Sequence, residues 1–328
     1  MRRRTFVFLL AVGFSIFAAG ENSFSAEKSG KAVPVRIGVV SRSTLDMPYY
    51  VARDRGFFRE EGLEVEIVLV RSSLSVQALL SGSIAFATAT GTAVNAAVSG
   101  ADVRVVFAMT DRPSFDLIAH PSIATIQQLR GHKIGYGGIG GLSETIVRQI
   151  LTSNRIPLDQ VTFLALNASD LTYPSLKAGV IDAAMLQIPP TFLAQDEGYR
   201  KLAAGADYYR VVQGGLTTTR AVLAERPELA VHMIRAVLRA VRLIKSDRKY
   251  ALDFMKGPYL ELGKERDRFV ERIYEAAAQG YLANGAVDEN LQREMIATAA
   301  RRLKPPPAVP RERVFDFTPA LKAAETVR

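Results

Sequence analysis

The stretch MPYYVARDRGFFREEGLEVEIVLV, residues 47–70, decides the fold because it joins a short amphipathic helix to a strand through a turn at Gly62. A second strand-like run, VPVRIGVV, precedes it at residues 33–40. The order strand, loop, helix, glycine turn and strand is typical of the start of a parallel α/β sheet. Loops at the carboxyl ends of such strands face a ligand crevice. The opening of the chain therefore predicts small-molecule binding.

The rest of the chain extends this pattern into two series of alternating strands and helices, followed by a helical end. A chain of 328 residues exceeds what one hydrophobic core usually serves, so two lobes are expected. We expect the second lobe, residues 113–221, to be inserted into a first lobe made of residues 26–112 and 222–328. Crossings near residues 111–115 and 216–222 would then form a two-segment hinge.

The N-terminus has the features of a secretory signal peptide, which we place at residues 1–25. Three arginines precede an apolar run at residues 6–19, which is shorter than the roughly 20 residues of a membrane anchor. Cleavage after Gly20 or after Ser25 is compatible with the small residues there, and the arginines weakly resemble a twin-arginine signal. The chain contains no cysteine. It therefore cannot carry a lipid on a cysteine after the signal peptide, and it cannot form a disulfide. These features predict a soluble protein of a Gram-negative periplasm.

The net charge of +9 does not indicate nucleic-acid binding. Arg235, Arg239, Arg242 and Lys245 recur at helical spacing beside apolar residues, which is typical of the solvated face of an amphipathic helix. No motif of interleaved aromatic and basic residues accompanies them. We therefore expect no nucleic-acid partner.

Several motifs resemble the signature of periplasmic solute-binding proteins of the nitrate, sulfonate and taurine uptake type. In chain order they are PYYVAR at 48–53, GFF at 56–58, EGLEV at 61–65, LSGSIAF at 80–86, SGA at 99–101, IQQLRGHKIG at 126–135 and LKAGVIDAA at 176–184. The resemblance implies an α/β, two-lobed type II periplasmic-binding fold, with two parallel-rich sheets flanked by helices and a hinge of two crossing segments. It also implies capture of a small solute and its delivery to the permease subunits of an ABC importer, without a cofactor and without catalysis. We expect a monomer.

Two other functions remain as alternatives. A related branch of this superfamily contains enzymes that make the thiamine pyrimidine with a histidine and a cysteine-rich iron site. This chain lacks cysteine, which disfavours that branch. A ligand-sensing interaction module on the same two lobes is the second alternative.

The run GYGGIG, residues 135–140, follows a predicted strand and precedes a predicted helix. A dinucleotide site would also need an acidic residue at the end of the following strand, where this chain has Asn167. The glycines are explained either by a tight turn or by backbone N–H groups that bind a polar or anionic solute. On the second interpretation the binding residues are Gly140, Gly141, Leu142 and Ser143.

The other candidates for solute contact follow the ends of predicted strands. In the first lobe they are Ser43, Leu45, Met47, Tyr49, Ser72, Ser73, Thr88, Thr90, Gly91, Thr92 and Arg112, and in the second lobe Asn167 and Gln187. The threonines could instead be simple strand formers. Arg112 could bind a carboxylate or sulfonate, or form a salt bridge with Asp111 at the hinge. Asp46 could cap the helix that starts at Pro48.

No catalytic or metal-binding pattern is recognisable. The three histidines, His120, His132 and His232, are scattered, so no metal site is predicted. We expect a small organic solute, anionic or amide-rich, and the sequence does not identify it.

Overall fold

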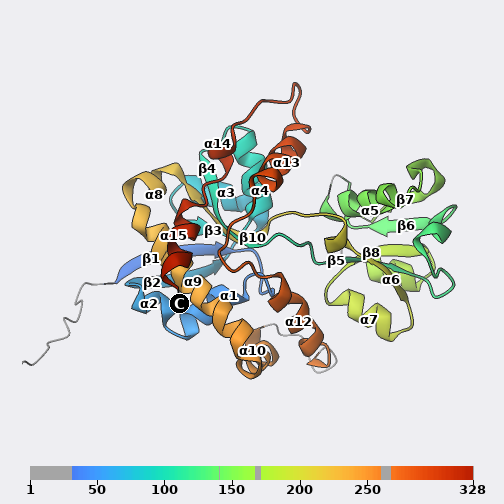
Figure 1. The fold of residues 1–328 in the computed structure, drawn as a ribbon, viewed down its shortest axis with the longest axis horizontal. Helices are drawn as coiled ribbons and strands as arrows, with labels where there is room; N and C mark the ends of the chain where they lie inside the picture. Colours follow the sequence, from blue (N-terminus) through green and yellow to red (C-terminus); the bar gives the residue numbers. More distant parts are fainter. Residues whose placement is uncertain (1–31, 140, 167–170, 260–266, 328) are drawn as a thin grey trace, which may run out of the picture. The chain divides into compact units, whose positions relative to one another are not determined.

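The computed structural model describes residues 32–139, 141–166, 171–259 and 267–327. The predicted signal peptide lies outside these residues. Two five-stranded sheets form the framework (Figure 1). The first has the order β2-β1-β3-β10-β4, with β1 Val33–Val39, β2 Leu63–Leu69, β3 Phe86–Ala87, β4 Val103–Thr110 and β10 Gln213–Thr219. The second has the order β7-β6-β8-β5-β9, with β5 Phe115–Ala119, β6 Lys133–Tyr136, β7 Thr162–Ala165, β8 Ala183–Gln187 and β9 Arg200–Ala204.

Both sheets are mixed and parallel-rich, as expected, because one strand in each runs against the other four. Strands β2, β1 and β3 pair in parallel, as do β7, β6 and β8. Strand β10 is antiparallel to β3 and β4, and β5 is antiparallel to β8 and β9. Each reversed strand directly follows a passage from one sheet to the other, where the chain enters the new sheet without a crossover helix.

The second crossing lies earlier than the sequence predicts. Residues 216–222 were expected to cross, but β10 already pairs with the first sheet from Gln213, opposite Thr110. The chain leaves the second sheet after β9 and a short helical turn, Gly205–Asp207, so residues 208–212 make the passage. The division of the chain into lobes 26–112 plus 222–328 and 113–221 stays a prediction. The passage at residues 208–212 would move its second boundary from residue 221 to this segment.

The opening stretch folds as its residues predict. Helix α1 (Met47–Asp54) has Pro48 in its first turn, where the missing N–H costs nothing. A short helix α2 (Phe57–Glu60) follows, and Gly56 and Gly62 bracket it with φ of +74° each, a conformation that other residues rarely adopt. Strand β2 begins immediately after the second glycine.

The C-terminal helices complete the core around the first sheet. Helix α9 (Pro227–Ser246) has a buried stripe at helical spacing and packs against α1 and α15 (Thr318–Thr326) (Figure 1). Helix α13 (Glu289–Ala300) packs against α4 (Thr90–Val98). The other helices are α3 Ser72–Leu80, α5 Leu142–Ser153, α6 Thr172–Lys177, α7 Pro190–Asp196, α8 Arg220–Glu225, α10 Arg248–Phe254, α12 Val270–Gly280 and α14 Arg311–Val314. Within the described ranges, no helix has the length and apolar character needed to cross a membrane.

Candidate ligand-binding cavity

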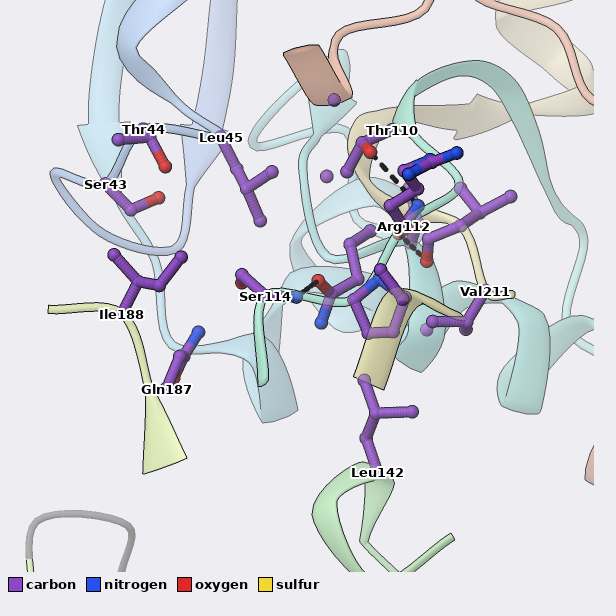
Figure 2. Close-up of a pocket in the computed structure, with 18 of the residues that line it drawn as sticks. Ser43, Thr44, Leu45, Thr110, Arg112, Ser114, Leu142, Gln187, Ile188 and Val211 are labelled. Atoms are coloured by element: carbon purple, nitrogen blue, oxygen red, sulfur yellow. Dashed lines mark hydrogen bonds between the residues drawn. The ribbon is translucent and has the colours of Figure 1, made fainter. Parts of the chain in front are cut away.

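A cavity of about 870 Å³ lies where the two sheets meet. Its wall comes from the loop after β1, the first turns of α4 and α5, both crossing segments and the end of β8, and α12 and α13 add residues to it. Figure 2 shows Ser43 and Leu45 from the first sheet's side, with Gln187, Ile188 and Leu142 from the second. The carboxyl ends of strands thus supply the wall, as in open α/β sheets that bind ligands.

Most of the predicted contact residues line this cavity. They are Ser43, Leu45, Ser72, Thr88, Thr90, Gly91, Thr92, Arg112, Leu142 and Gln187. Leu142 was proposed as the start of a helix, and the others were proposed because they lie at or just beyond a strand's end, which is the position that the cavity occupies. Their contact with a solute stays a prediction.

Seven predicted residues are not part of the described cavity wall, and two of them, Gly141 and Ser143, belong to the glycine-rich turn. Met47 and Tyr49 are fully buried in the core, because the first turn of α1 faces the sheet. The Tyr49 hydroxyl donates a hydrogen bond to the Gly215 carbonyl at 2.8 Å. Gly140 and Asn167 are not among the described residues, and exposed Ser73 is absent from the cavity wall.

The described part of the glycine-rich run, residues 135–139, ends β6 and is hydrogen-bonded to the start of α5. Ser143 is buried, and its hydroxyl accepts a hydrogen bond from the Gly137 N–H at 3.1 Å. A Cβ on Gly141 would lie 2.9 Å from the Gly138 carbonyl oxygen. Neither Gly141 nor Ser143 lines the cavity. These contacts favour the tight-turn interpretation of the run.

Asp46 holds the loop after β1 from the inside. Its carboxylate is 3% exposed and accepts hydrogen bonds at 3.3 Å from the Ser41 N–H and the Ser43 hydroxyl. Although Asp46 occupies the position before α1, its side chain does not cap the helix. Burial raises the pKa of Asp46 to about 6, against the opposing effect of its hydrogen bonds with Thr88, Ser41 and Ser43. The carboxylate therefore stabilises the loop at a desolvation cost.

Two tyrosines from the C-terminal region hold the same loop through its backbone. The Tyr259 hydroxyl donates to the Ser43 carbonyl at 2.8 Å, and the Tyr281 hydroxyl donates to the Thr44 carbonyl at 2.6 Å. Burial raises the pKa of both hydroxyls, so they remain protonated donors. Sequence reasoning missed these contacts, because more than 200 residues separate each donor from its acceptor.

On the second sheet's side, Asp116 of β5 forms a charged group with Lys201. The Lys201 ammonium lies 2.9 Å from one Asp116 oxygen, and the Thr191 hydroxyl donates to the other at 3.3 Å. Burial raises the pKa of Asp116, the lysine and the hydroxyl oppose this, and the nearby Asp207 adds to it. Asp116, Lys201 and Asp207 all line the cavity, and none was predicted from the sequence.

The crossing segments are joined by Arg210. Its guanidinium Nε lies 2.9 Å from Asp111, and its Nη1 lies 2.8 Å from Asp288 at the start of α13. The predicted salt bridge between Asp111 and Arg112 is therefore wrong, because Asp111 pairs with Arg210 instead. Arg112 donates its backbone N–H to the Thr110 hydroxyl at 3.1 Å (Figure 2).

Among the described residues, no group of three or more histidine, cysteine, aspartate or glutamate side chains is arranged to hold a metal ion.

Two mixed sheets joined by two crossings beside a cavity define the fold of the two-lobed periplasmic binding proteins. The structure is similar to the aliphatic sulphonate binding protein SsuA of Escherichia coli, with a TM-score of 0.70 at 17% identity over 86% of this chain and 97% of that chain. It is also similar to the nitrate-binding protein NrtA of Synechocystis, with a TM-score of 0.63 at 11% identity over 90% and 89%. These likenesses establish the fold.

The sequence itself establishes the family. Residues 44–251 match the NMT1/THI5-like family, and the chain belongs to it. The riboflavin-binding protein RibY of Chloroflexus aurantiacus is 27% identical over 234 residues, which are 66% of this chain and 64% of that protein's length. The resemblance read from the motifs is confirmed at the level of family and fold.

Proposed function

We propose that this protein is the solute-binding component of an ABC-type importer, and that it acts as a monomer in the periplasm. It captures a small organic solute between its two sheets and presents it to the permease subunits. Binding is reversible and needs no cofactor. Membership of the NMT1/THI5-like family and the periplasmic binding fold support this role.

The observation that carries the proposal is the chemistry of the cavity. Its wall combines hydroxyls, such as Thr90, and an amide, Gln187, with apolar side chains such as Leu45 and Phe192. This mixture is typical of sites that bury an organic molecule and fix its orientation with a few polar groups. Wall residues come from both sheets, so a bound solute would favour the closed arrangement of the two.

Thermal unfolding and calorimetry of the purified protein against a panel of solutes test the proposal. The panel includes riboflavin, aliphatic sulfonates and nitrate, which are named for the relatives, together with amino acids and carboxylates. A solute present at 100 times its Kd stabilises the folded state by about 2.7 kcal/mol, which is visible as a higher Tm. Failure of every solute to raise the Tm or to release heat would contradict a binding role.

The same samples separate binding from catalysis. We expect the solute that binds to be recovered chemically intact after prolonged incubation, as judged by mass spectrometry. Steady conversion of the solute would instead favour an enzyme of the thiamine-pyrimidine type. Fractionation of the native host tests the location, and the full-length N-terminus should be absent from the periplasmic form.

A further inference from the structure

Some charged side chains on the cavity wall have a partner within the chain and others do not. Among the described residues, seven acidic and basic side chains line the cavity. Five of them already interact within the chain: Arg42, Asp46, Asp116, Lys201 and Arg302. Two of opposite sign are left, Arg112 and Asp207. Among the described residues, neither side chain has a hydrogen-bond or ion-pair partner.

Arg112 stands at the first crossing, two residues after β4 ends at Thr110. Only its backbone is engaged, because the N–H binds the Thr110 hydroxyl and the adjacent Asp111 is taken by Arg210. The guanidinium is exposed on the cavity wall. A free guanidinium in such a place is a ready partner for a carboxylate or sulfonate, which it can bind with two parallel hydrogen bonds.

Asp207 stands immediately before the second crossing, at the end of the helical turn Gly205–Asp207. Its carboxylate is exposed on the cavity wall and lies close enough to Asp116 to disfavour a charge there. Lys201 is the neighbouring cation, and it is already paired with Asp116 at 2.9 Å. Asp207 is therefore available to a cation or an N–H donor from outside the chain.

The two free charges lie on or beside the two segments that connect the sheets, and both line the cavity. The salt bridge between Asp111 and Arg210 ties the two crossing segments together, and it lies one residue before Arg112 and three residues after Asp207. Closure around a solute removes water from this region. A charge that loses water without gaining a partner is costly, so closure is favourable only when both charges are met.

We infer that the solute is dipolar, with a carboxylate or sulfonate that meets Arg112 and an ammonium or other cationic nitrogen group that meets Asp207. This inference rests on the proposed binding function and narrows its solute class. A simple anion satisfies Arg112 but leaves Asp207 desolvated and unpaired. A simple cation does the reverse. The cavity thus selects against solutes with one charge.

Matched solutes of graded length test the inference with the unaltered protein. The series comprises ω-amino carboxylates from β-alanine to 8-aminooctanoate, the fatty acids of equal length and the alkylamines of equal length, each measured by calorimetry. We expect one length of amino acid to bind at least tenfold tighter than the acid and the amine of that length. Equal affinity of the amino acid and the plain acid would overturn the inference in favour of an anion site.

Charge-neutralising variants test which residues are responsible. Arg112→Gln and Asp207→Asn should each weaken binding of the preferred amino acid at least tenfold. In Asp207→Asn, the amino acid and the fatty acid of equal length should also bind with equal affinity. Arg242→Gln and Asp159→Asn, exposed and absent from the cavity wall, are the matched controls and should leave every affinity unchanged. An unchanged affinity in Asp207→Asn would refute its role.

The outcomes also separate this inference from the proposed function. A panel in which some solute binds but charge pairing has no influence removes only the dipolar solute class. A panel in which no solute of any charge binds removes the proposed function and the inference with it. Circular dichroism of each variant shows whether a lost affinity reflects a lost fold.

Discussion

Replacing the buried Asp46 by asparagine should make the protein more stable at neutral pH. The pKa of Asp46 rises from its usual 3.8 to about 6, mainly because burial removes water from the carboxylate. One pKa unit corresponds to about 1.4 kcal/mol. A rise of roughly two units therefore means that the ionised carboxylate lowers the free energy of unfolding by about 3 kcal/mol relative to the protonated form.

The sign of the effect follows from where the proton is held. Between pH 3.8 and about 6, the unfolded chain has released the Asp46 proton and the folded chain retains it. The free energy of unfolding therefore falls as pH rises through this window and is constant with respect to this group above it. Asp46→Asn cannot ionise, and its amide oxygen can still accept from the serines of the loop.

Urea unfolding of the ligand-free proteins at pH 4, 5, 6 and 7.5 measures the effect. The difference in unfolding free energy, variant minus natural protein, should grow by about 2.4 kcal/mol from pH 4 to pH 7.5, with equal m-values, because the unfolded chain is already partly ionised at pH 4. Asp159→Asn, which removes an exposed carboxylate, is the control and should give a difference that is nearly independent of pH. A pH-independent difference for Asp46→Asn would refute the burial argument.

Three further substitutions, the first with Gly91→Ala as its control, test the framework around the cavity. Gly215→Ala should cost more than about 2 kcal/mol in thermal unfolding, since φ is +125° and the Cβ would lie 2.0 Å from a backbone oxygen, whereas Gly91→Ala, in open helical space, should be neutral or stabilising. Tyr281→Phe should cost about 1 kcal/mol and weaken solute binding, because the Thr44 carbonyl loses its donor. Arg210→Gln should cost at most about 1 kcal/mol, since the guanidinium is half exposed, and added salt should shrink that difference.

The opening of the fold could be predicted because its signals are local. The helix expected from Pro48 begins at Met47, and the strand expected after Gly62 begins at Leu63. Proline, glycine and the spacing of apolar side chains act within a few residues, so one sequence reveals them. Strand β3 is only two residues long, Phe86–Ala87, and its neighbour β10 pairs with it at a single position. That pairing depends on a segment about 130 residues away.

The direction of β10 illustrates a second limit. The residues at 213–219 favour a strand, but their strand propensity does not determine whether that strand pairs in parallel or antiparallel. Its orientation is fixed by the passage back from the second sheet. The same limit applies to Met47 and Tyr49, which were placed in the cavity because they follow the first strand. The phase of α1 against the sheet buries both.

The cavity wall could be predicted where strand ends define it and not where distant side chains meet. Thr88 and Arg112 follow strands, so position alone indicated them. Asp116 and Lys201 are 85 residues apart, and each looks like an ordinary surface charge in the sequence. Only the folded structure shows that these two side chains form an ion pair. The same contacts show which charged side chains on the described cavity wall have no partner.

The loop after β1 explains how such a cavity can be adapted to a solute without disturbing the fold. Its shape is held through the Ser43 and Thr44 carbonyls, which the two tyrosines bind, and through Asp46. Backbone carbonyls accept these bonds whatever side chain the residue carries. Leu45, which lines the cavity beside them, makes none of these bonds. Its side chain can therefore change with the solute while the loop keeps its conformation, whereas position 46 must keep a side-chain oxygen that accepts from Ser41 and Ser43.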